Sequence, residues 1–170
     1  KLKKEALVDF KRLGFPDRHN EEWKYTRVDG FVQQRFETAS QEGCRATDSE
    51  PSFRDAFPLL CEKAVISLVN GVAEALDHLP EGVIIQPLAQ ALINHADKIK
   101  PYLGQILKHE HGFQALNTAI MDSGLFIYLP EGASLPEPLL ISHWHDKAGK
   151  ATYLRHLVIA SEGSSATIIE

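Results

Sequence analysis

The chain has 170 residues, of which 44% are hydrophobic and 24% are charged, and its formal net charge is −5. This composition is ordinary for a globular protein and argues against nucleic-acid binding, which usually requires a basic patch. No apolar run is long enough for a membrane span and no signal peptide is visible, and a chain of this length can bury a core without disulfides or metals.

The first part of the chain predicts two helices separated by a break. Apolar residues recur at helical spacing at Leu2, Ala6, Phe10 and Leu13. Gly14 and Pro16 then form a stop signal. Asn20 offers an N-cap for a second helix that runs to about Phe36. The candidates for its buried face are Trp23, Phe31, Val32 and Phe36.

The middle of the chain alternates between polar and apolar segments. Thr38–Pro51 has almost no large apolar residue and predicts a mobile loop, and Phe53–Glu62 predicts a short helix. The β-branched run Ala64–Val69 predicts a strand, and the Asn70-Gly71 pair that follows it is typical of a type I′ hairpin turn. Further elements are expected at Val83–Ile85 (strand), Leu88–Ala96 after Pro87 (helix) and Phe113–Ile120 before Gly124 (helix).

After Gly124 the pattern becomes strand-like. Glycine, proline, serine and acidic residues separate four short apolar runs: Leu125–Leu129, Leu139–His145, Tyr153–Ala160 and Ala166–Ile169. We therefore expect an α+β fold with a boundary near Ser123–Gly124. Residues 1–123 would form a mostly helical domain with a small β-hairpin, and residues 124–170 the start of an all-β domain. The chain opens on Lys1 and ends inside a strand-like run, so we expect it to be cut within a longer β region.

Histidines give the best metal candidate by spacing. His143 and His145 are two apart in a predicted strand, so both rings could meet one ion, although two surface histidines beside a turn are the favoured interpretation. His109 and His111 would diverge on a helix. Cys44 and Cys61 form no metal-binding pair and are interpreted as free thiols.

No enzyme motif is present. The chain lacks a phosphate-binding G-x-x-x-x-G-K-[ST] loop and a G-x-S-x-G elbow, and the adjacent Glu21 and Glu22 diverge on a helix, where they are expected as ordinary first-turn charges. Arg155 and His156 are polar residues within an apolar predicted strand. We interpret them as solvated side chains at a strand end; the alternative is that they lie at a sheet edge or contact a partner. Asn117 is expected to be buried and to form a hydrogen bond with a nearby backbone group.

The segment GFPDRHNEEWKYT, Gly14–Thr26, resembles the N-terminal signature of the SufD family, part of the SUF iron–sulfur cluster assembly system. FQALNTAIMDSGLFIYLPEGASLPEPLLI (Phe113–Ile141) and YLRHLVIASEGSSATIIE (Tyr153–Glu170) support the resemblance, which runs from about Gly14 to the last residue. The positions that carry the first motif are Gly14, Phe15, Pro16, Glu22, Trp23, Lys24 and Tyr25.

The resemblance implies a non-enzymatic, cytoplasmic assembly factor whose all-β part is the first rungs of a right-handed parallel β-helix. Such a protein pairs with a SufB-type scaffold and a SufC-type ATPase, through regions that lie largely beyond this chain. An iron–sulfur cluster would reside transiently on the whole complex, with no cofactor in this chain; flavin binding stays open. The motif residues would be structural. A homodimer through Ala166–Ile169 is expected from its uncovered strand edge. The alternatives are a generic protein-interaction module and a metal-dependent hydrolase that uses His143 and His145.

Overall fold

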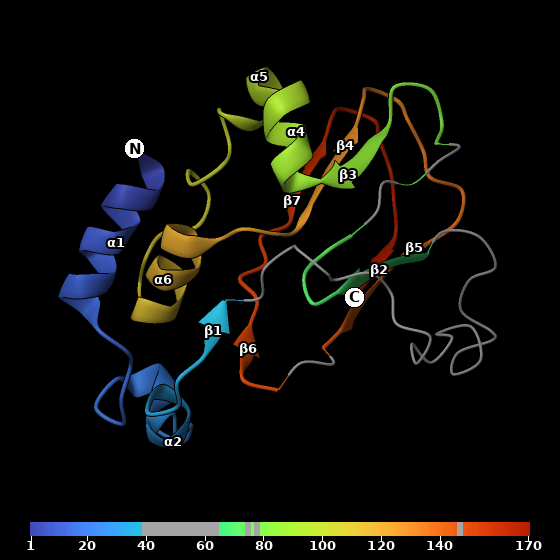
Figure 1. The fold of residues 1–170 in the computed structure, drawn as a ribbon. Coiled ribbons are helices and arrows are strands. Elements are labelled where there is room, and N and C mark those ends of the chain that lie inside the picture. The colour runs from blue at the N-terminus through green and yellow to red at the C-terminus, as the bar shows by residue number, and fades with distance from the viewer. Residues whose placement is uncertain (39–64, 74–75, 77–78, 146–147) are drawn as a thin grey trace.

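Helices α1, α2 and α6 gather on one side of the computed structural model, and two three-stranded sheets form the other side (Figure 1). The structure describes residues 1–38, 65–73, 76, 79–145 and 148–170. The expected helix Phe53–Glu62, the cysteines Cys44 and Cys61, and all of the expected loop Thr38–Pro51 except its first residue lie outside the described residues.

The helical elements are α1 (Leu2–Leu13), a 3₁₀ turn η1 (Glu21–Trp23), α2 (Asp29–Val32), α4 (Leu88–Asn94), α5 (Ala96–Ile99) and α6 (Gly112–Ile120). The strands are β1 (Glu37–Thr38), β2 (Val65–Val69), β3 (Ile84–Pro87), β4 (Leu125–Leu129), β5 (Leu139–Trp144), β6 (Lys150–Ala151), β7 (Leu157–Ala160) and β8 (Ile168–Ile169). The mixed α+β class expected from the sequence is confirmed.

Parallel pairing dominates the sheets. Strand β5 lies between β2 and β8 and is parallel to both, whereas β4 pairs antiparallel with β3 and parallel with β7. Phe126 lies opposite Leu157, and Leu139 lies opposite Ile168, so the chain returns to a neighbouring position after a nearly constant interval. A further parallel bridge, which joins Ser134 to Ser165, repeats that interval. Successive passes of the later chain therefore run side by side in the same direction.

The main core lies between the two three-stranded sheets. Leu125, Ile127 and Leu129 alternate along β4 and pack with buried residues of β2, β3 and β5. Phe126 points to the opposite side of β4 and joins a second cluster with Leu88 and other apolar residues of α4 and α5. This alternation follows from the period of two in a strand, and it buries both faces of β4. Each fully buried side chain of this size stabilises the fold by about 1.5–3 kcal/mol.

Helix α1 packs against α6 through an apolar face and two polar contacts. Ala6 is fully buried in α1. Lys3 Nζ donates a hydrogen bond of 2.6 Å to the carbonyl of Met121, the residue that ends α6, where the helix dipole favours a cation. Asp9 Oδ2 lies 2.9 Å from His109 Nδ1, in the segment before α6. The first helix and the Gly14 break are thus confirmed at the predicted positions.

The second helix expected from Asn20 to about Phe36 is wrong. Only η1 and the four-residue α2 are helical there. Asn20 Oδ1 accepts a hydrogen bond of 2.9 Å from the backbone N–H of Asp17, so its side chain caps the preceding turn and not a following helix. The residues between the two pieces include the β-branched Thr26 and Val28, which disfavour a helix.

The strands predicted after residue 64 form at the predicted positions. Two of them are shorter than predicted, because β7 begins at Leu157 and β8 begins at Ile168. Asn70 and Gly71 have φ values of +50° and +86°, as their turn requires. Val69 and Val72 exchange two backbone hydrogen bonds of 2.9 Å across the turn, while the rest of β2 pairs in parallel with β5. The division at Ser123–Gly124 stays a prediction; β2 and β3 share sheets with strands that follow it.

Within the described residues, none of the helices has the length and apolar character for crossing a lipid bilayer.

Candidate functional site

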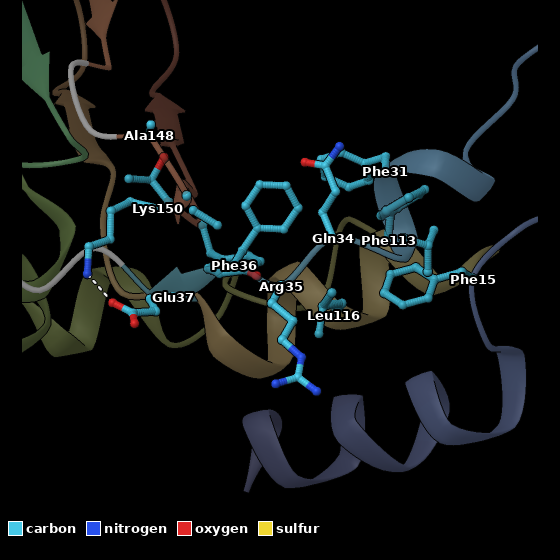
Figure 2. A pocket seen from close by; sticks show the side chains of 15 residues that line it. Phe15, Phe31, Gln34, Arg35, Phe36, Glu37, Phe113, Leu116, Ala148 and Lys150 are labelled. Carbon is cyan, nitrogen blue, oxygen red and sulfur yellow. Dashed lines mark hydrogen bonds and ion pairs between the residues drawn. The ribbon is translucent and has the colours of Figure 1, made fainter.

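An open groove of about 920 Å³ lies between the N-terminal segment, α6 and the residues around β6 (Figure 2). Four phenylalanines from different parts of the chain line it: Phe15, Phe31, Phe36 and Phe113. We call these four residues and the space they line the aromatic groove. Polar side chains of Gln34, Arg35 and Lys150 also line it. An apolar concave surface with a few polar groups is the usual character of a binding site.

Phe113, in the first turn of α6, is the centre of the aromatic contacts. Its ring lies 5.2 Å from the ring of Phe15, 5.3 Å from that of Trp23 and 6.1 Å from that of Phe31. These centroid distances are in the range in which tilted aromatic pairs attract one another. The segment that precedes β1 is thus held on α6 by ring contacts in place of the continuous helix that the sequence predicted.

The seven motif positions separate into packed and exposed groups. Pro16 is buried, Gly14 and Trp23 are half-buried, and Phe15 packs between Phe10 and Phe113. The other three side chains face solvent: Glu22, Lys24 and Tyr25. Tyr25 is 92% exposed, and its ring contacts the ammonium of Lys24 at 5.6 Å.

An ion pair closes the polar end of the groove (Figure 2). Lys150 in β6 donates to the carboxylate of Glu37 in β1, and this contact joins the two strands of that small sheet. The hydrogen bond and the charge of Lys150 hold the pKa of Glu37 below its ordinary value. Glu37 therefore stays ionised at neutral pH.

The structure places the two predicted metal candidates with different partners. His143, near the end of β5, lies with its Nε2 2.8 Å from Glu170 Oε1, and its ring centroid is 5.5 Å from that of His156. His145 is exposed, and its Nε2 lies 3.2 Å from Thr152 Oγ1. Sequence reasoning missed Glu170 because its proximity to His143 depends on the parallel register of β5 and β8.

His156 contacts buried backbone. Its Nδ1 accepts a hydrogen bond of 3.1 Å from the backbone N–H of Leu125, at the start of β4. Burial lowers the pKa of His156, an effect that the charge of Glu170 opposes. This contact corrects the expectation that His156 is solvated at a strand end.

Arg155 is likewise not a solvated strand end. Its guanidinium donates to Asn117 Oδ1 at 2.6 and 3.1 Å and to Thr118 Oγ1 at 3.0 Å. Asn117 Nδ2 donates in turn to the carbonyl of Leu154 at 2.9 Å, so the prediction that Asn117 satisfies nearby backbone is confirmed. Burial lowers the pKa of Arg155 from its usual value. The network ties α6 to the segment that leads into β7.

A sequence profile described as the SufBD protein N-terminal region matches residues 1–141. The chain belongs to the SufBD family. This confirms the resemblance found at Gly14–Thr26. Curated relatives include an iron–sulfur cluster assembly SufBD family protein of Synechocystis sp., which is 32% identical over 91 residues, 53% of this chain and 19% of the relative.

Two other SufBD relatives show the same partial coverage. A chloroplastic iron–sulfur cluster assembly SufBD family protein of Arabidopsis thaliana is 28% identical over 116 residues, 65% of this chain and 21% of the relative. The iron–sulfur cluster assembly protein SufD of Bacillus subtilis is 27% identical over 92 residues, 53% of this chain and 21% of the relative. The match thus spans about a fifth of the length of these three relatives.

Proposed function

We propose that this chain is the N-terminal part of a non-catalytic subunit that acts in iron–sulfur cluster assembly. The observation that carries the proposal is the match of residues 1–141 to the N-terminal region of SufBD proteins. Relatives with names that specify iron–sulfur cluster assembly support it. In this proposal the cluster is cargo of the complete complex, formed in the cytoplasm, and the chain holds no resident cofactor.

We further propose that residues 124–170 are the beginning of a right-handed parallel β-helix. The support is the nearly constant sequence interval between parallel partners, as in Phe126–Leu157 and Leu139–Ile168, which has the size of a solenoid repeat. A solenoid is built from passes that contact only their neighbours, and β5, between β2 and β8, fits such a stack. Strands β2 and β3 from residues 1–123 would then join its sheets, and helices α1, α2 and α6 would lie to one side of it.

The proposed partners are a SufB-type scaffold and a SufC-type ATPase. The test uses the chain extended by its native C-terminal sequence, coexpressed with both partners, one of which carries an affinity tag. We expect the three proteins to elute together in size-exclusion chromatography. Failure of the folded, extended protein to elute with either partner would contradict the proposal and favour a generic interaction module.

A further inference from the structure

Three side chains with metal-binding atoms meet between the two main sheets. His143 comes from β5, His156 directly precedes β7, and Glu170 follows β8. One donor atom of each lies within 4.8 Å of the donor atoms of the other two. We call these three residues the histidine–glutamate cluster. It brings together residues at or near three strands of the last part of the chain, and it differs from the His143–His145 pair that spacing alone suggested.

Two imidazole nitrogens of the cluster are buried without a hydrogen bond. His143 Nδ1 and His156 Nε2 have no partner in the part of the chain that the structure describes. Oε1 of Glu170 lies 3.7 Å from His156 Nε2, which is too long for a hydrogen bond. Of these two atoms, His156 Nε2 is the one that faces the carboxylate of Glu170, and a buried polar atom without a hydrogen bond at that position calls for a bound species.

We propose that His143, His156 and Glu170 bind one divalent transition-metal ion. Two imidazoles and one carboxylate form the donor set of zinc and non-haem iron sites, whereas calcium and magnesium prefer oxygen donors alone. At metal–ligand distances of about 2.0–2.2 Å, donors in a tetrahedral site are roughly 3.4 Å apart. The distances of 2.8 and 3.7 Å from Glu170 Oε1 to the two histidine Nε2 atoms lie on either side of that value. The donor atoms of all three residues lie within 4.8 Å of one another, so the side chains must move closer together around the ion.

Exposure of the cluster fits a site with an open coordination position. The side chains of His143 and His156 are 24% and 19% exposed, so both rings are largely shielded from solvent. The Glu170 side chain is 57% exposed, and its carboxylate already lies 2.8 Å from His143 Nε2. Water would complete the coordination from the Glu170 side. The proposal needs only these three residues and does not rest on the proposed function.

Metal binding must rearrange two hydrogen bonds: the contact of 2.8 Å between His143 Nε2 and Glu170 Oε1, and the bond that His156 accepts from Leu125. Because His156 Nδ1 accepts the N–H of Leu125, the neutral ring carries its proton on Nε2. An ion at Nε2 requires that nitrogen to lose its proton and Nδ1 to gain one, which breaks the bond to Leu125. The ion therefore binds more weakly than at a preformed site. Its arrival also changes the Leu125 amide, which adsorption to surface histidines would leave untouched.

The test is a titration of the metal-free 170-residue chain with Co²⁺ and with Zn²⁺, followed by calorimetry and, for Co²⁺, by visible absorption. We expect one ion per chain. His143→Ala, His156→Asn and Glu170→Gln should each weaken binding at least about tenfold, because each removes a ligand. His156→Asn keeps an acceptor near the position of Nδ1, so the Leu125 contact and the fold are preserved. His145→Ala is the matched control and should bind as the unmodified chain does.

Zn²⁺ should also shift the Leu125 amide resonance in ¹H–¹⁵N spectra. Absence of saturable binding overturns the proposal. The proposal is also overturned if His143→Ala and His145→Ala weaken metal binding equally while His156→Asn leaves it unchanged. That result would assign the ion to the pair His143 and His145. Glu170→Gln replaces an exposed group, so it tests the proposal even if a histidine variant fails to fold. If Glu170→Gln binds the ion with full affinity, the proposed site at the histidine–glutamate cluster is overturned.

Discussion

The carbonyl oxygen of Gly14 lies so close to the backbone of Gly112 that a β-carbon added at Gly112 would be 1.6 Å from it. The end of α1 and the start of α6 therefore meet backbone to backbone. Gly14 itself has φ +66°, a conformation that glycine adopts readily. Its N–H donates a hydrogen bond of 2.8 Å to the carbonyl of Phe10. The first glycine of the family motif thus positions α6, which carries Phe113.

Gly112→Ala should destabilise the chain. The added methyl group meets backbone, which cannot rotate away, so α1 and α6 must separate; we expect a loss of about 2–3 kcal/mol in the free energy of unfolding. Gly30→Ala is the control, because a β-carbon at Gly30 has no atom within 4 Å and alanine favours the helix. Urea denaturation measures both variants. Equal stability of the two would contradict the backbone contact.

Trp23 and Tyr25 should respond differently to replacement by alanine. The Trp23 ring packs at 5.1 Å from His111 and 5.3 Å from Phe113, so Trp23→Ala should cost about 2 kcal/mol, below the value for a fully buried tryptophan. Tyr25 is 92% exposed, so Tyr25→Ala should change stability by less than about 0.5 kcal/mol. Thermal and urea unfolding followed by far-ultraviolet circular dichroism separates them. A larger loss for Tyr25→Ala than for Trp23→Ala would refute this arrangement.

Asn117 and Arg155 should be energetically coupled. Asn117→Ala leaves the half-buried guanidinium of Arg155 without its principal acceptor, and Arg155→Ala removes the same contact from the other side. A double-mutant cycle should therefore give an interaction energy of about 1–3 kcal/mol, measured by chemical denaturation. Additivity of the two single effects within about 0.5 kcal/mol would show that Asn117 and Arg155 are not energetically coupled.

The contact between Asp9 and His109 should make stability fall in acid. The hydrogen bond from His109, followed by that from Arg12, lowers the pKa of Asp9 in the folded chain. A lowered folded-state pKa stabilises the fold above the unfolded value of about 3.9, and this contribution disappears as the pH falls through the folded value. Melting temperatures of the unmodified chain should thus drop more steeply below about pH 4 than those of Asp9→Asn. Parallel pH profiles would disprove the contribution.

Local patterns predicted the elements whose cause is local. The apolar spacing of α1, the Gly14 break and the Asn70-Gly71 turn depend on residues within a few positions, and each is confirmed. The prediction of a helix after Asn20 failed because Trp23 and Phe31 make ring contacts with Phe113, which lies far later in the chain, and such a partner leaves no periodic signal.

The residues of the candidate sites were harder to predict from the sequence, again because their partners lie on other parts of the chain. His143 was identified by spacing, but its neighbours His156 and Glu170 come from later passes of the chain, and only the strand register brings them together. Arg155 and His156 were recognised as unusual in an apolar strand. Their partners, Asn117 and the backbone of Leu125, lie on elements whose placement sequence alone does not give.

The position of β2 in its sheet has a consequence for the order of folding during synthesis. Val65 pairs with Leu140, so β2 leaves the ribosome long before its partner strand exists, whereas Leu139 of β5 meets Ile168 of β8 after a much shorter stretch of chain. Closing the longer loop carries the larger entropic cost. The apolar β2 strand therefore stays unpaired until β5 has been synthesised, and during that interval its apolar side chains can associate with other chains.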